Sequence, residues 1–182
     1  MTVLTPANQL TLLRMFLIPA FVILVVYGYL GSALAVFVTA GLTDALDGVI
    51  ARRSGQKTTL GAWLDPMADK LLLVTTYVVL ALPNLDLANR LPVWLTVCII
   101  SRDVVIILTV AVVNLAIGRR TFRPSIFGKI ATGVYVVTGV AALYYNYLER
   151  PAAIVTLLVY ASLVMSVISA AHYAVQMIKL GH

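Results

Sequence analysis

Long apolar runs dominate this sequence and constrain its fold more than any other feature. Six of them can be drawn, and each can cross a hydrocarbon core of about 30 Å at about 1.5 Å per helical residue. Breaks rich in Gly, Pro and Asn separate them. The segments cover residues 10–29, 32–52, 60–82, 92–117, 126–147 and 151–178. The sequence therefore predicts an all-α, polytopic membrane protein, a bundle of six transmembrane helices.

The overall composition supports a membrane bundle. Of the 182 residues, 62% are hydrophobic and 11% are charged, whereas a soluble domain carries about 25% charged residues. We expect residues 1–182 to form a single membrane domain, because the chain is too short to add a soluble catalytic domain. Cys98 is the only cysteine, which excludes a disulfide framework or a thiolate metal site. The first segment imitates a signal peptide, but its apolar character continues past the small-residue site, so we expect a retained helix.

Basic residues are distributed unevenly among the loops that six spans would create. The side that holds both termini has Arg14, Arg52, Arg53, Lys57, Arg119, Arg120, Arg123, Lys129 and Lys179. The opposite loops have only Arg90 and Arg150, each with an acidic residue nearby. The positive-inside rule therefore places both termini in the cytoplasm. We expect the chain to lie in the cell (inner) membrane. Membrane topology alone requires basic inner loops, so part of this positive charge needs no functional explanation.

Four of the seven acidic residues lie in two neighbouring apolar segments, Asp44 and Asp47 in the second and Asp65 and Asp69 in the third. Ionisable residues inside spanning helices are costly, so they are functional candidates by default. Spacings of three and four residues put each pair on one helical face. Two antiparallel helices that turn near Gln56 would set Asp44 level with Asp69 and Asp47 level with Asp65. We expect one carboxylate cluster just inside the cytoplasmic surface.

Such a cluster needs compensating positive charge, because neighbouring carboxylates cannot all stay ionised alone. All-oxygen ligation suits Mg²⁺ or Mn²⁺, and the lack of nearby His and Cys disfavours zinc and copper. Hard cations beside Arg52 and the basic residues after it would make a site for a polyphosphate. Gly48, Ala51 and Gly61 would leave room for a bulky ligand against the backbone. Pro66 is expected either to tilt the third helix or to start it.

The acidic motif resembles a known family signature. All eight positions and the spacer of the CDP-alcohol phosphatidyltransferase signature are present, as Asp44-x-x-Asp47-Gly48-x-x-Ala51-Arg52, eight residues, and Gly61-x-x-x-Asp65-x-x-x-Asp69. Asn8-x-x-Thr11-x-x-Arg14 and residues 64–70 resemble the branch that makes phosphatidylglycerol phosphate. The resemblance implies an enzyme of phospholipid biosynthesis. It would transfer a phosphatidyl group from CDP-diacylglycerol to glycerol 3-phosphate, release CMP, and form a homodimer.

The same resemblance implies roles for the motif residues. Asp44, Asp47 and Asp65 would be ligands of two divalent metal ions, and Asp69 would be the general base and a further candidate ligand of the second metal. The positions that would hold the CDP part of the donor are Gly48, Ala51, Arg52 and Gly61. Lys70 follows Asp69 but lies about 100° around the helix, so we expect Lys70→Gln to be much milder than Asp69→Asn.

The acceptor alcohol is less constrained by the sequence. The candidates for binding an anionic acceptor are Arg119, Arg120, Arg123 and Lys129. Topology-setting charge explains the three arginines equally well. Gly128-Lys129-x-x-Thr132 resembles an element of the family's fifth helix, but Ala131 stands where phosphatidylglycerol phosphate synthases usually have a second lysine. Pro124-Ser125 and Arg102-Asp103 resemble the family's cardiolipin synthases, so transfer to phosphatidylglycerol, or to another alcohol of the same family, is the alternative.

Arg102 and Asp103 lie deep in the fourth apolar segment. Because adjacent helical residues point about 100° apart, we expect them not to pair with each other. Each should instead find another polar partner inside the bundle and serve a structural role. His172 is expected to be a packed histidine rather than a metal ligand.

A second class of protein is compatible with buried acids. They also mark ion pathways, so an ion-coupled transporter is the non-enzyme alternative. Transporters tend to have inverted repeats and a midplane site, whereas this chain shows no internal repeat and its acids gather toward one face. The sequence therefore favours the enzyme.

Overall fold

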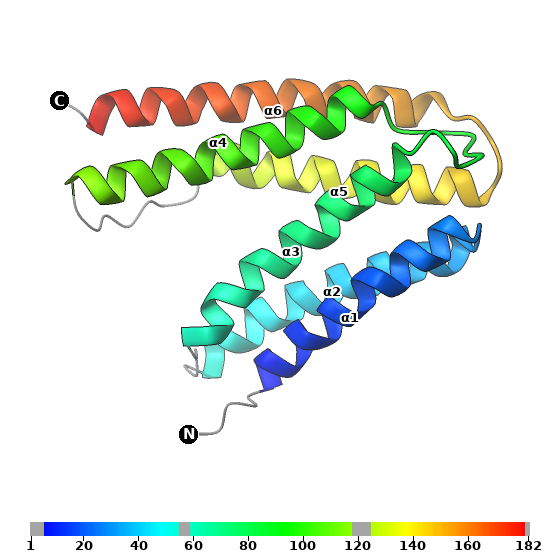
Figure 1. The fold of residues 1–182 in the computed structure, drawn as a ribbon, viewed down its shortest axis with the longest axis horizontal. Helices are drawn as coiled ribbons and strands as arrows, with labels where there is room; N and C mark the ends of the chain where they lie inside the picture. The colour runs from blue at the N-terminus through cyan, green and yellow to red at the C-terminus, as the bar shows by residue number, and fades with distance from the viewer. Residues whose placement is uncertain (1–5, 55–58, 118–124, 181–182) are drawn as a thin grey trace.

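The computed structural model describes residues 6–54, 59–117 and 125–180. They form helices and no strand, which confirms the predicted all-α class. Figure 1 shows the arrangement of these helices. The helices are α1 (Pro6–Val26), α2 (Leu30–Ser54), α3 (Thr59–Leu80), α4 (Val93–Ile117), α5 (Ile126–Tyr147) and α6 (Ala153–Leu180).

The helix boundaries agree closely with the predicted segments. α1 begins at Pro6, earlier than predicted, and proline suits the first turn of a helix, where its missing N–H is not needed. α3 runs without a break from Thr59 to Leu80, so Pro66 does not start it. α5 begins after Ser125, whose Oγ accepts a hydrogen bond from the Gly128 N–H at 3.0 Å. That N-cap explains why α5 starts where the sequence predicts.

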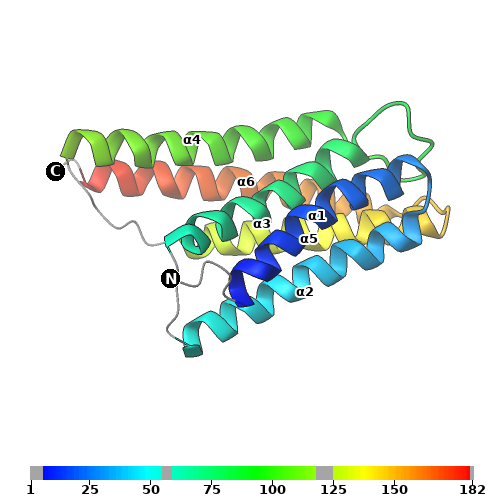
Figure 2. The ribbon, with the colours of Figure 1, turned by 60° about the horizontal axis from the view of Figure 1, so that its bottom comes forward.

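Successive helices run back and forth along the long axis of the bundle (Figure 1). The C-terminal ends of α2, α4 and α6 lie at one end, called here the motif end. The C-terminal ends of α1, α3 and α5 lie at the other, called the far end. α1 and α2 diverge from α4 and α6 toward the motif end, as Figures 1 and 2 both show. The helices thus lie closer together at the far end than at the motif end.

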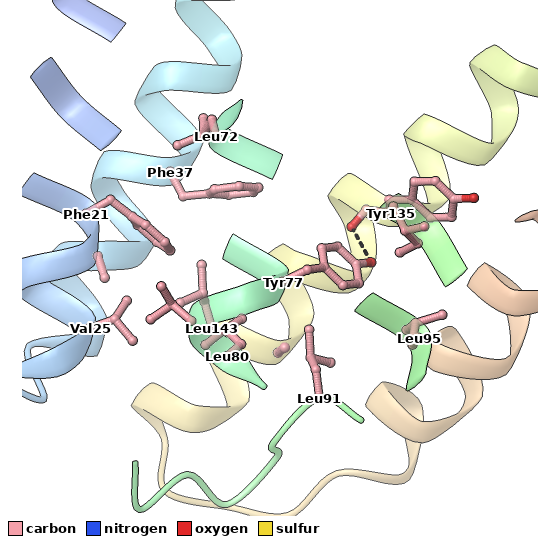
Figure 3. Packing of buried hydrophobic residues seen from close by; sticks show 14 of the residues in the cluster. Phe21, Val25, Phe37, Leu72, Tyr77, Leu80, Leu91, Leu95, Tyr135 and Leu143 are labelled. Atoms are coloured by element: carbon pink, nitrogen blue, oxygen red, sulfur yellow. Dashed lines mark hydrogen bonds between the residues drawn. The ribbon is translucent and has the colours of Figure 1, made fainter. Parts of the chain in front are cut away.

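The hydrophobic core lies in the middle of the bundle and toward the far end. Phe21 of α1 faces Phe37 of α2 with ring centroids 6.0 Å apart (Figure 3). The hydroxyl of Tyr77 donates to the carbonyl of Tyr135 at 3.1 Å, so even the polar atom of this buried tyrosine is paired. The fully buried large side chains also include Val25, Leu80, Leu91, Leu95, Ile99 and Leu143. Their packing fixes the far ends of α1, α3 and α5.

Small polar residues let α6 pack closely on its neighbours. Ser162, Ser166 and Ser169 are buried along one face of α6, and Ser162 shares a 2.9 Å hydrogen bond with Thr138 of α5. Small and hydroxyl-bearing residues of this kind are enriched where membrane helices meet. Every helix also exposes large apolar side chains, such as Phe16, Val38 and Leu115.

Two helices are long and apolar enough to cross a membrane over their described residues. They are α5, over Ile126–Tyr147, and α6, over Ala153–Gln176. Shorter apolar helical stretches in α1, α2 and α3 cover Leu13–Val26, Leu30–Thr43 and Lys70–Leu80. Six helices are therefore confirmed in the described parts of the chain, while the crossing of a membrane by all six stays a prediction.

Candidate active site

The motif residues lie on two adjacent helices that run in opposite directions (Figure 1). Asp44 and Asp47 belong to α2, and Asp65 and Asp69 belong to α3. The two helices contact each other. Neither is interrupted within the motif, as the spacing within each pair of acids predicts. The side chains of these four residues lie outside the described set. The formation of a single carboxylate cluster therefore stays a prediction.

The residues expected to hold the CDP part share these two segments. Gly48, Ala51 and Arg52 lie in the last turns of α2, and Gly61 lies in the first turn of α3. They are grouped with the acids at the motif end, although their side-chain surroundings are also outside the described set. Among the residues whose side chains are described, no group of three or more His, Cys, Asp or Glu could hold a metal ion. The predicted metal ligands are not among those residues.

The acceptor candidates are only partly placed. Arg119, Arg120 and Arg123 lie outside the described residues. Lys129 is exposed in the first turn of α5, directly after the Ser125 cap. Ala131 is completely buried in the same helix. Lys129 is thus accessible at the motif end, whereas a larger residue at position 131 would lie inside the bundle.

A cavity of about 580 Å³ adjoins the motif segments and is lined by residues from α1 to α5. On α2 it includes Gly41 and Leu42, which lie within one turn before the motif, and on α3 it includes Lys70, which directly follows it. Arg14, Arg102 and Asp103 add the other charged groups. The apolar lining consists chiefly of Phe37, Val38, Leu72, Leu73, Val136 and Val140. The cavity is therefore amphipathic, with a charged part beside the motif and an apolar part deeper in the bundle.

A chain of ionic and hydrogen-bonding contacts crosses the wall of this cavity. Lys70 Nζ lies 3.1 Å from Asp103 Oδ2, and Arg102 Nη1 lies 2.6 Å from Asp103 Oδ1. Arg102 Nη2 also donates to Ser169 Oγ of α6. The prediction that Arg102 and Asp103 do not pair with each other is wrong. The expectation that each finds another polar partner is confirmed.

The length of the arginine side chain explains this correction. The backbone directions of adjacent residues diverge by about 100°, but a guanidinium on a flexible stem can fold back to its neighbour's carboxylate. An interior of low dielectric favours that contact, since an unpaired buried charge is costly. The side chains of Arg102 and Asp103 are only 10% and 17% exposed.

His172 is packed, as predicted. Its ring lies against Phe127, with centroids 4.8 Å apart, and its Nε2 lies 3.1 Å from Nε2 of Gln176. The contact with Phe127 joins α6 to the start of α5, while Gln176 lies one turn further along α6. These contacts account for His172 as a structural residue.

Comparison with known proteins decides the family. The model of the CDP-alcohol phosphatidyltransferase family matches residues 4–173. The chain belongs to the CDP-alcohol phosphatidyltransferase family. It is therefore an enzyme of the class that makes phospholipids by CDP-alcohol phosphatidyl transfer. This membership replaces the transporter alternative, and with the two apolar helices it points to a membrane protein.

Two relatives of this phosphatidyltransferase carry different names. The chain is 35% identical over 183 residues to a probable phosphatidylglycerophosphate synthase of Mycobacterium tuberculosis, and the match covers 95% of this chain and 81% of that protein. It is also 35% identical over 164 residues to a cardiolipin synthase (CMP-forming) of Homo sapiens, and this match covers 80% of this chain and 53% of that protein. The chain thus spans about half the length of the human relative.

Lys70 makes a contact that the sequence pattern does not specify, an ion pair with Asp103. The expectation that Lys70→Gln is much milder than Asp69→Asn stays a prediction. A signal was available, since Lys70, Arg102 and Asp103 are charged residues inside apolar segments and need partners. Their spacing along the chain does not say which of them pair.

Proposed function

We propose that this phosphatidyltransferase moves a phosphatidyl group from CDP-diacylglycerol to glycerol 3-phosphate and releases CMP. The observation that carries the proposal is the complete motif on two contacting antiparallel helices, next to an amphipathic cavity. The long match to a probable phosphatidylglycerophosphate synthase supports the choice of acceptor. The resemblance of residues 64–70 to that branch of the family supports it as well.

The donor set fits two divalent cations. Carboxylates spaced three apart on α2 and four apart on α3 are oxygen ligands of the kind that Mg²⁺ and Mn²⁺ prefer, and neither helix contains His or Cys. Asp44, Asp47 and Asp65 would hold the ions, with Asp69 a further ligand of the second. When bound, the metal ions neutralise the pyrophosphate of the donor and the departing CMP.

The chain's own residues supply the remaining chemistry. Asp69 accepts the proton of the acceptor hydroxyl. The freed oxygen forms a bond to the phosphorus that carries diacylglycerol, and the bond from that phosphorus to the oxygen bridging to CMP breaks. Arg52 pairs with the phosphates of the CDP part, while Gly48, Ala51 and Gly61 allow it close to the backbone.

The cavity suits a donor that is part nucleotide and part lipid. Its charged portion, with Lys70 and Arg14, lies next to the motif helices, and its apolar portion lies deeper between α2, α3 and α5. A phosphate-bearing head would lie toward the first, and an acyl chain would lie along the second. This arrangement keeps diacylglycerol in the bilayer while the nucleotide reaches water.

Glycerol 3-phosphate would bind near the start of α5. Lys129 is exposed there, and Arg119, Arg120 and Arg123 precede it in the sequence. Cations of this kind pair well with a phosphate monoester. Phosphatidylglycerol is the second candidate acceptor, because Ala131 is completely buried and supplies no second lysine.

An acceptor screen tests both candidates. Purified protein in detergent would be given CDP-diacylglycerol with Mg²⁺ or Mn²⁺ and either acceptor, and CMP and lipid products would be quantified. We expect phosphatidylglycerol phosphate to form fastest. Cardiolipin formation from phosphatidylglycerol without use of glycerol 3-phosphate would overturn the choice of acceptor. No CMP release with any alcohol would overturn the transferase itself.

The same proposal includes the membrane arrangement. All six helices would cross the inner membrane, with the motif end and both termini in the cytoplasm. The support is the charge distribution, since Arg90 and Arg150 are the only basic residues in the far-end connections. A homodimer is proposed from the family resemblance, and the mass of the purified protein by light scattering tests it.

A further inference from the structure

Four helices meet around the side chain of Arg102. Its guanidinium contacts Asp103 on its own helix α4 and Ser169 on α6. Asp103 in turn contacts Lys70 on α3. The chain of contacts therefore runs from α3, through α4, to α6.

The fourth contact is a close approach to α5. A Cβ atom added at Gly128 would lie 3.2 Å from Arg102 Nη2 and 3.2 Å from Ser125 Oγ. Separations this short require the neighbouring atoms to move. The guanidinium thus lies against the backbone of the first turn of α5, the turn that also holds Lys129. Only glycine fits there without displacing either Arg102 or the helix cap.

The two ends of this chain of contacts belong to opposite sides of the proposed reaction. Lys70 is the residue after Asp69, the proposed base, on the donor-binding helix α3. Gly128 is the residue before Lys129, which the proposed function places at the acceptor. A rigid connection between them would fix the acceptor hydroxyl relative to the base.

We propose that Arg102 and Asp103 are positioning residues that set the first turn of α5 against the Asp69 segment of α3. They act through Lys70 and Gly128 and do not touch the reacting atoms. The ion pairs join α3 to α4, and the hydrogen bond from Arg102 to Ser169 extends the contacts to α6. The side chains of Arg102 and Asp103 are largely buried, so their contacts fix geometry better than a surface pair between long side chains. The inference rests on the proposed function, because it concerns the placement of the two substrates.

Gly128→Ala and Gly133→Ala form a matched pair that tests the proposal. Both glycines lie within α5, so both changes raise helix propensity by a similar amount. A Cβ at Gly133 would meet nothing within 4 Å, whereas one at Gly128 would meet Arg102. A misplacement of about 1 Å can cost on the order of 10²-fold in rate. The contacts at Gly128 require Arg102 or the cap to shift by a few tenths of an ångström. We therefore expect Gly128→Ala to lower kcat severalfold, up to about tenfold, and Gly133→Ala to leave it unchanged.

The ion pair between α3 and α4 is tested with Lys70→Gln and Asp103→Asn. We expect each to lower kcat about tenfold or more. CDP-diacylglycerol binding, measured by calorimetry, should change less than about twofold in Asp103→Asn, whereas Lys70→Gln should also weaken it, because Lys70 lines the charged part of the donor cavity. Because both act through one contact, the double variant should be no worse than the poorer single variant. Asp103→Glu should recover part of the loss. Asp86→Asn and Arg90→Gln, exposed at the far end, are the charge-matched controls.

Each outcome bears on a defined proposal. Unchanged kcat in Gly128→Ala, or a kcat loss in Asp103→Asn that matches its loss of donor binding, would overturn the positioning role. Should Asp103→Asn fail to fold, the glycine pair decides the question alone. The assay uses whichever acceptor the wild type consumes, so use of phosphatidylglycerol alone overturns the acceptor assignment and leaves this test intact. Absence of CMP release with every acceptor removes the proposed function and this inference together.

Discussion

Replacing Asn146 by alanine should destabilise the bundle from its far end. Asn146 is 2% exposed, and its side-chain amide makes two hydrogen bonds to the backbone of Asn89. Its Oδ1 accepts from the Asn89 N–H at 2.7 Å, and its Nδ2 donates to the Asn89 carbonyl at 3.3 Å. The Asn89 side chain donates to the Arg150 carbonyl at 2.7 Å and accepts from the Ala152 N–H at 2.8 Å. The two asparagines therefore join the α3–α4 connection to the α5–α6 connection.

The size of the effect follows from the bonds lost. A net hydrogen bond contributes about 0.5–1.5 kcal/mol, so losing two amounts to about 1–3 kcal/mol. The bond at 3.3 Å is the weaker one, but the part-buried Asn89 N–H would be left without its partner. We therefore expect a loss of about 2 kcal/mol in the free energy of unfolding. For soluble chains of this size that corresponds to a fall in Tm of about 4–8 °C.

Thermal unfolding in detergent, followed by circular dichroism, measures this loss. Asn84→Ala is the control, because Asn84 is exposed in the same connection. Asn89→Ala combined with Asn146→Ala should destabilise less than the sum of the single changes, since they share bonds. The hydrogen-bonded pair Asn89 and Asn146 is called here the Asn89–Asn146 clamp. If Asn146→Ala melted at the same temperature as Asn84→Ala, this clamp would contribute nothing to stability and the reasoning would be wrong.

Three further predictions concern the site and the topology. Asp69→Asn should lower turnover by about 10²–10⁴-fold and still bind CDP-diacylglycerol. Asp44→Asn should lose binding and turnover together. Equal loss of binding in both variants would make Asp69 chiefly a metal ligand. Removal of divalent ions with EDTA should abolish CMP release, and Mg²⁺ or Mn²⁺ should restore it; full activity in EDTA would exclude the metal site. A reporter fused after His182 should be active only in the cytoplasm, and activity outside would reverse the topology.

The helices could be predicted from the sequence because apolar runs and their breaks set their limits directly. α5 begins and ends where the sequence predicts, at Ile126 and Tyr147, because Ser125 caps its start. The effect of Pro66 could not be decided in advance, since proline is compatible both with a first turn and with a kink. The structure carries α3 through that position.

The motif could be predicted more fully than its surroundings. Asp44, Asp47, Asp65 and Asp69 are identified by type and spacing, and the structure places both pairs in helical register on contacting helices. The contacts of Arg102 and Asp103 depend instead on how α3, α4 and α6 are arranged in space. No spacing along the chain specifies that Lys70 reaches Asp103. The wrong expectation that Arg102 and Asp103 do not pair has another cause, because it considered the backbone directions and not the length of the arginine side chain.

The bundle separates the groups that hold it together from those proposed to react. The buried aromatic core and the Asn89–Asn146 clamp lie in the middle and at the far end, while the motif lies at the end where α1 and α2 diverge from α4 and α6 (Figure 2). Changes at the two ends should therefore have opposite signatures. Asn146→Ala should lower Tm and leave the kcat of folded enzyme unchanged, because the contacts around the motif end are not altered. Gly128→Ala should lower kcat with little change in Tm, because it moves one turn of α5 and leaves the core intact.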